Sequence, residues 1–130
     1  MGQQQLLLII LGVIVVGIAV AVGITMFTDN AVNANRDAVT NDLVNLSARA
    51  QQFYRRPTAL GGGGNSFVGL KMANLTNRPS NANGTYTLGA VTANDVIITG
   101  VGTEKADASN NVTMRIKVSD TVADSVFVVY

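Results

Sequence analysis

An uninterrupted apolar run near the N-terminus constrains this chain more than any other feature of its sequence. Residues 6–27 read LLLIILGVIVVGIAVAVGITMF and contain no charged side chain. As an α-helix rising about 1.5 Å per residue, the run would span roughly 33 Å, enough to cross the hydrocarbon core of a bilayer. Exposing its sixteen bulky side chains to water would cost roughly 30 kcal/mol, at about 2 kcal/mol each. Since these side chains fall on every helix face, we expect lipid or similar helices to cover them.

Two kinds of N-terminal segment fit the apolar run poorly, and a third fits its length well. A cleavable secretory signal has a basic start and a shorter apolar core, whereas the first five residues, MGQQQ, carry no charge. An N-myristoylation motif requires Ser or Thr at the sixth position, where this chain has Leu6. A simple membrane anchor for an exported domain fits the length and stays open as the alternative.

The composition argues against catalysis and against a nucleic-acid partner. Among the 130 residues there is no histidine and no cysteine, so the commonest general base, nucleophile and transition-metal ligands are all missing. The net charge is +1, with basic and acidic residues interspersed. We therefore expect a protein that is not an enzyme, with no catalytic site, no metal site, no cofactor and no bound nucleic acid.

A second helical pattern follows directly in residues 28–56, which contain no proline. Its apolar positions are separated by 7, 4, 3, 4 and 3 residues, the spacing of one helix face. These positions are Val32, Val39, Leu43, Leu46, Ala50 and Phe53, and all of them except Ala50 are predicted specifically as helix–sheet packing residues. Arg55 and Arg56 suit the negative end of a helix dipole, and Pro57 cannot continue the helix. We expect a sheet to cover this face; a coiled-coil stalk is the less favoured alternative.

Glycines punctuate the apolar run at Gly12, Gly17 and Gly23, and Ala19 with Gly23 has the small-xxx-small spacing of closely packed apolar helices. Two interpretations stay open. The glycines either allow close packing between neighbouring helices, or they reflect the ordinary tolerance of membrane spans for glycine.

After Pro57 the character of the chain changes. Residues 58–66 include four consecutive glycines and predict a loop, residues 67–72 a short strand, and residues 74–84 an exposed loop. From residue 85 the apolar period becomes two, which predicts four strands in an antiparallel meander. The predicted strands are residues 86–91, 95–101, 112–118 and 125–130. Residues 96–101 and 126–129 are apolar on both sides and predict inner strands or a contact between subunits.

These patterns predict an α+β fold in which an antiparallel sheet packs on the C-terminal half of a long N-terminal helix. Residues 1–56 form the predicted stem, with an apolar part at 1–28 and an amphipathic part at 29–56. Residues 57–130 form one predicted head domain.

This arrangement resembles the type IV pilin superfamily, which includes major pilins and secretion-system pseudopilins. The resemblance covers the whole chain as architecture and about the first third as sequence character. It implies a pilin-like structural subunit of an extracellular, cell-surface helical filament that polymerises with copies of itself. It further implies transient membrane insertion before assembly and dependence on an inner-membrane assembly machinery. A single-span anchored exported domain or a pseudopilin is the alternative. Adhesion, motility, DNA uptake and secretion are not distinguished by this sequence.

In that family the apolar helix halves bundle at the filament centre. The resemblance therefore implies an assembly surface made of Gln5, Leu6, Leu7, Leu8, Ile9, Ile10, Leu11, Val13, Ile14, Val16, Ile18, Val20, Ile24 and Phe27. The family usually has Glu at the fifth mature position. That position is the neutral Gln5 if Met1 is the first mature residue, and Leu7 if cleavage follows Gly2. The family's frequent helix proline and cysteine-closed C-terminal loop are absent from this sequence.

Four Asn-x-Ser/Thr sequons occur in the chain, at Asn45, Asn74, Asn83 and Asn111. The last three fall in predicted loops and are possible glycosylation sites, whereas Asn45 falls on the predicted helix. Chance occurrence in a chain rich in Asn and Thr is the alternative.

Overall fold

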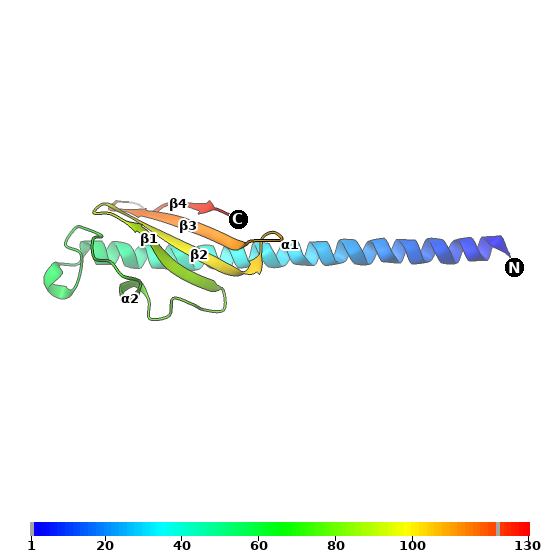
Figure 1. Cartoon of the computed structure of the whole chain (residues 1–130), viewed down its shortest axis with the longest axis horizontal. Helices are drawn as coiled ribbons and strands as arrows, with labels where there is room; N and C mark the ends of the chain where they lie inside the picture. The colour runs from blue at the N-terminus through cyan, green and yellow to red at the C-terminus, as the bar shows by residue number, and fades with distance from the viewer. Residues whose placement is uncertain (1, 122) are drawn as a thin grey trace. The chain divides into compact units, whose positions relative to one another are not determined.

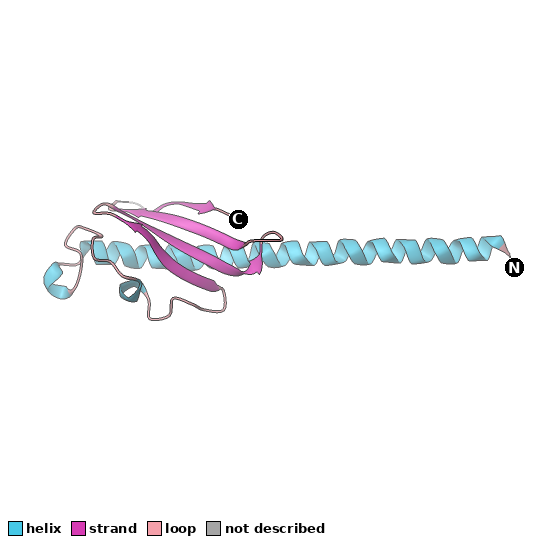
Figure 2. Ribbon diagram, in the orientation of Figure 1, coloured by secondary structure: helices cyan, strands magenta, loops and turns pink. Residues whose placement is uncertain are grey.

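The computed structural model describes residues 2–121 and 123–130, and it confirms the predicted α+β class. A long helix comes first and an antiparallel four-stranded sheet follows it (Figure 1, Figure 2). The elements are α1 (Gln3–Arg55), a 3₁₀ turn (Thr58–Leu60), α2 (Met72–Leu75), β1 (Gly84–Val91), β2 (Asp95–Lys105), β3 (Asn111–Ser119) and β4 (Ala123–Val128). The contacts divide the chain into two compact units, one ending at Ala31 and the other Val32–Tyr130. The amphipathic part of α1 thus belongs to the same unit as the sheet, which is called the head unit below.

The sheet is the predicted meander, with its strands in the order β1-β2-β3-β4 and every neighbouring pair antiparallel. Thr99 of β2 lies opposite Thr87 of β1 on one side and Arg115 of β3 on the other. β2 is an inner strand, as its apolar character predicts. β4 is an edge strand, so the inner-strand interpretation of residues 126–129 is wrong, and Phe127 and Val128 remain exposed.

One face of the sheet packs on the part of α1 that lies in the head unit (Figure 2). Strand β3 alternates as its period of two predicts, with every second side chain buried. The buried apolar residues on the sheet side are Tyr86, Val96, Ile98, Val112, Met114, Ile116 and Val118. Those on α1 are Val32, Val39, Leu43, Leu46 and Ala50. Because helix and sheet bury their apolar faces against each other, neither is stable in water alone.

The predicted strand at residues 67–72 is wrong. Gly69 has a φ of +87°, a left-handed conformation that ends extended structure, and α2 begins at Met72. Phe67 is nevertheless fully buried, and its ring centroid lies 4.8 Å from that of Tyr54. Its backbone N–H donates to the carbonyl of Ala93 at 3.1 Å. The apolar side chains that suggest a strand therefore come from a turn that closes one end of the core.

The four glycines after α1 end the helix and satisfy its last carbonyl groups. The N–H of Gly63 donates to the carbonyl of Phe53 at 2.8 Å, and the N–H of Gly64 donates to that of Arg56 at 3.0 Å. A Cβ on Gly63 would lie 1.8 Å from the carbonyl oxygen of Ser66. The tract is therefore a folded helix cap that only glycine can build, and it is more than a connection from helix to sheet.

Candidate functional site

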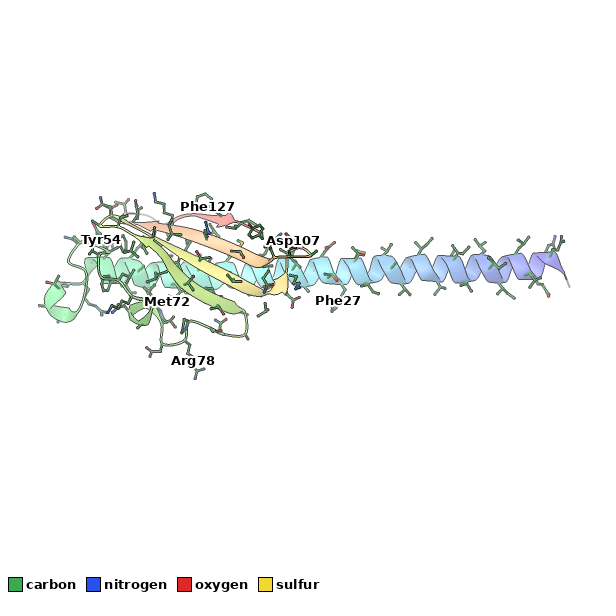
Figure 3. The ribbon with its side chains drawn as sticks, viewed as in Figure 1. Phe27, Tyr54, Met72, Arg78, Asp107 and Phe127 are labelled. Carbon is green, nitrogen blue, oxygen red and sulfur yellow. The ribbon has the colours of Figure 1, made fainter. Side chains whose placement is uncertain are left out.

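The first candidate site is the part of α1 before Val32, whose bulky apolar side chains have no cover. Each of the sixteen large apolar side chains between Leu6 and Phe27 is 52% to 77% exposed. In Figure 3 the side chains project from both sides of this stretch, which ends near the labelled Phe27. The residues of the implied assembly surface lie here, namely Gln5, Leu6, Leu7, Leu8, Ile9, Ile10, Leu11, Val13, Ile14, Val16, Ile18, Val20, Ile24 and Phe27. At about 2 kcal/mol per side chain, so much exposed surface requires an apolar partner.

By length and composition, α1 is the single helix among residues 2–121 and 123–130 that is suited to cross a membrane. None of its most apolar window is buried by the rest of the chain. Such a helix near the N-terminus can act as a membrane anchor or as a signal segment.

Two hydroxyl groups in the uncovered stretch of residues 6–28, called the bare stretch below, are satisfied inside the helix itself. The hydroxyl groups of Thr25 and Thr28 donate to the carbonyls of Ala21 and Ile24, at 3.1 and 3.0 Å. This bonding lets a hydroxyl enter an apolar environment without losing its hydrogen bond. The chain therefore remains compatible with an apolar surrounding up to Thr28, one residue before Asp29.

The second candidate site is the face of α1 that holds the sheet. Of the predicted packing residues, Val32, Val39, Leu43 and Leu46 are buried in the core, and Phe53 is partly buried against it. A Cβ added to Gly100 of β2 would lie 2.8 Å from Val39, so the strand backbone passes directly over the helix at this point. The close approach explains why β2 carries glycine in the middle of a buried face.

Asn35 is a buried polar residue on the same helix face, only 9% exposed, and it joins α1 to the edge of the sheet. Its Nδ2 donates to the carbonyl of Asn83 at 2.9 Å, and its Oδ1 accepts from the backbone N–H of Glu104 at 3.3 Å. A Cβ on Gly102 would lie 2.0 Å from that Oδ1. The amide of Asn35 thus ties the start of β1 and the end of β2 to one helix position.

Asp42 makes the second polar connection between helix and sheet. Its Oδ2 accepts hydrogen bonds from Nδ2 of Asn81 at 2.9 Å, Nδ2 of Asn83 at 3.0 Å and the hydroxyl of Tyr86. Burial works to raise the pKa of Asp42, but these three hydrogen bonds outweigh it and hold the pKa below its ordinary value. Burial and the Asp42 carboxylate both raise the pKa of Tyr86, which stays a neutral donor.

Sequence reasoning missed both polar connections, although a signal was present. Asn35 lies three residues after Val32 and four before Val39, and Asp42 lies three after Val39 and four before Leu46. Both therefore fall on the apolar face of the helix, where a polar side chain needs a partner. Their partners lie 39 to 69 residues away in the chain, so no local pattern identifies them.

The structure separates the predicted glycosylation sites by the state of their amide nitrogens. Asn74 is exposed, and its Oδ1 accepts from the N–H of Lys71 at 3.0 Å, which leaves its Nδ2 outside these bonds. Nδ2 of Asn83 donates to Asp42, and Nδ2 of Asn111 donates to the carbonyl of Gly102 at 3.0 Å. Attachment of a glycan to Asn83 or Asn111 would use an amide nitrogen that already donates a hydrogen bond within the fold, whereas the amide nitrogen of Asn74 donates no such bond within residues 2–121 and 123–130.

The geometry defines a class of protein, a small α+β head on a helix whose first part is bare and of membrane-spanning length. Comparison with known proteins adds no relative to this description. No protein-family model, no curated protein and no solved structure matches this chain. Its function must therefore be inferred from its own residues.

Proposed function

We propose that this chain is the structural subunit of an extracellular, type IV pilus-like helical filament that assembles through its apolar N-terminal helix. The observation that carries the proposal is the bare stretch of α1, with sixteen large apolar side chains at least 52% exposed and spread over all helix faces. A helix that is apolar all round needs an apolar neighbour in every direction. A central bundle of identical helices provides such neighbours outside the membrane.

The same stretch accounts for a membrane stage before assembly. Lipid covers an all-round apolar helix as completely as a helix bundle does, and the residue range is long enough to span a bilayer. In the proposed cycle, subunits wait in the inner membrane, and an assembly machinery there transfers them into the filament. The partners are therefore other copies of this chain and that machinery.

Two features support the filament over a lone membrane anchor. A Cβ added to Gly12, Gly17 or Gly23 would meet nothing within 4 Å beyond its chain neighbours and the backbone of its own helix, so a neighbouring helix can approach closely at three levels. In addition, α1 supplies Val39 and Leu43 to the head core, so the helix that packs in the bundle is also the helix that carries the head. An anchor alone needs neither feature.

Electron microscopy of material sheared from producing cells tests the proposal, combined with mass spectrometry of the subunit. We expect thin filaments composed of this chain, and an N-terminal mass that identifies the first residue of the assembled form. Val15→Lys is the control variant, since a charge in the middle of the bundle prevents burial. Recovery of the wild-type chain only as detergent-extracted monomers from membranes would contradict the filament and favour the anchored exported domain.

A further inference from the structure

The charges of this chain are segregated in a way that the net charge of +1 conceals. Residues 43–94 contain five of the nine basic residues and none of the eight acidic ones. The basic residues in this range are Arg49, Arg55, Arg56, Lys71 and Arg78. The remaining residues hold four basic and all eight acidic side chains. One segment of the chain in the head unit therefore carries only basic charges, and the interspersed pattern inferred from composition does not extend to it.

Three of these arginines surround two adjoining surface pockets that share Arg49. One pocket, of about 160 Å³, is lined by Arg49 and Arg78, and the other, of about 180 Å³, by Arg49 and Arg56. Each has room for about five water molecules, and hence for a carboxylate group. Both lie within the head unit, between α1 and the segment that contains α2 and the labelled Arg78 (Figure 3). We call them the arginine pockets.

The arginine pockets are not neutralised by the chain itself. Arg49 donates to the carbonyl of Leu75 at 2.7 Å, which orients the guanidinium group and leaves its charge uncompensated. In the described part of the chain the only salt bridge joins Lys117 to Asp95. Asp42 is the one acidic residue that lines either pocket, and it accepts from three neutral donors. The two pockets together therefore keep an excess of two positive charges.

We propose that the arginine pockets are a docking surface for carboxylate side chains of a second copy of this chain, a contact that rests on the proposed filament. Charge complementarity identifies the partner. Asp37 and Glu104 are exposed and form no ion pair within residues 2–121 and 123–130. The bond from the N–H of Glu104 to Asn35 fixes that residue beside the first turns of α1 in the head unit. Arg49 lies 12 to 14 residues further along α1 than Asp37 or Asn35, about 18–21 Å away, and Arg56 directly follows the last residue of α1.

Asp37 and Glu104 lie near the start of the head part of α1, whereas Arg49 and Arg56 lie toward its end, so pairing them between copies joins unlike surfaces head to tail. A contact between unlike surfaces adds one copy after another. It builds a helical filament wherever the rotation between copies does not close into a ring. Arg36 and Lys105 lie beside the acidic pair in the sequence, so the acidic end is not uniformly negative. The contact consequently depends on pairs of individual side chains. In each pair the planar guanidinium group of an arginine binds one carboxylate through two parallel hydrogen bonds.

A charge-swap experiment on the full chain tests the contact. The double variant Arg56→Glu/Arg78→Glu reverses both pockets while leaving the bond from Arg49 to Leu75 in place, and we expect at least a tenfold loss of sheared filament. The control variant Lys71→Glu/Arg115→Glu makes the same change in net charge at two exposed residues that line neither pocket, and it should keep the wild-type yield. Near-UV circular dichroism of the detergent-solubilised subunit checks that each head is folded; if the double Glu variant is not, Arg56→Gln/Arg78→Gln replaces it.

Restoration by the partner surface is the decisive result. Adding Asp37→Lys/Glu104→Lys to the reversed pockets should recover filaments, whereas adding Asp120→Lys should not. Asp120 directly follows β3, whose last residue Ser119 pairs with Asp95, so it lies at the opposite sheet end from Glu104.

Wild-type yield from the reversed pockets, or failure of the Asp37 and Glu104 swap to restore filaments, would overturn the contact. Normal filaments that have lost binding to DNA would assign the pockets to an external polyanion instead. Absence of filaments from the wild-type chain would remove the proposed function itself, a distinguishable result.

Discussion

Replacing Leu43 with alanine should destabilise the head unit strongly, because this side chain lies at the centre of the helix–sheet contact. Leu43 is 0% exposed, and its neighbour Val44 is 48% exposed. Truncating a fully buried leucine in a packed core costs about 2–5 kcal/mol, the sum of lost burial and residual cavity. A domain of this size has about 5–15 kcal/mol of total stability, so the substitution removes a large share of it.

Urea unfolding of the full chain in detergent micelles measures the effect. With a slope of about 1 kcal/mol per molar urea, a loss of about 3 kcal/mol lowers the midpoint by about 3 M. Far-UV dichroism is unsuitable because the bare stretch of α1 stays helical in the micelle. The tyrosine bands of the near-UV dichroism report the head alone, since the three tyrosines, Tyr54, Tyr86 and Tyr130, all lie in it.

Val44→Ala is the matched control, one residue away on the exposed side of the same helix. It should shift the midpoint by less than about 0.5 M, as expected for a surface substitution. Equal shifts for Leu43→Ala and Val44→Ala would refute the reasoning, because the face assigned to the core would then carry no more stability than the face assigned to solvent.

The remaining predictions concern the polar connections and the glycines. The pKa of Asp42 is lowered in the folded head, so its ionised carboxylate stabilises the fold fully above pH 3.8, the ordinary pKa. This stabilisation is lost as the pH falls through the lower pKa of the folded state. Asp42→Asn should therefore reduce the fall in the free energy of unfolding at acid pH. Gly63→Ala places a Cβ 1.8 Å from the Ser66 carbonyl and should cost at least about 2 kcal/mol in urea unfolding, whereas Gly12→Ala meets nothing within 4 Å and should leave the head midpoint unchanged. Gly102→Ala should cost about 2–3 kcal/mol by displacing the buried amide of Asn35, seen as faster hydrogen exchange at the Glu104 amide.

Local periodicity accounts for the parts of the fold that could be predicted from the sequence. The helix face from Val32 to Ala50 and the alternation of β3 each repeat within a few residues, and the structure has both. Pro57 predicts the helix end to within a residue or two, since α1 ends at Arg55. These elements can be predicted from the sequence because every apolar residue in such a pattern has the same requirement, an apolar neighbour on one side of the element.

The elements that sequence reasoning missed depend on contacts between distant residues. Phe67 and Leu70 suggest a strand, yet both are buried from a turn, because Gly69 reverses the chain and Phe67 bonds to Ala93. The glycine tract predicts a loop, but its role as a helix cap requires the positions of the last α1 carbonyls. The three donors that Asp42 receives come from residues 39 to 44 positions later, a separation that no sequence window covers.

The bare stretch and the head have different consequences for the proposed filament. Burial of apolar side chains is strongly favourable but has no preferred direction, so it fixes the register in a bundle of helices such as residues 6–27 less firmly than an ionic contact does. The three glutamines before it, Gln3, Gln4 and Gln5, carry no charge that could fix the register of one subunit on the next. Charged groups in the heads can supply directional ionic contacts, since Arg49, Arg56 and Arg78 keep an excess of positive charge. If the arginine pockets set the register, the few filaments that remain after their reversal should have disordered subunit spacing, while membrane insertion is unchanged.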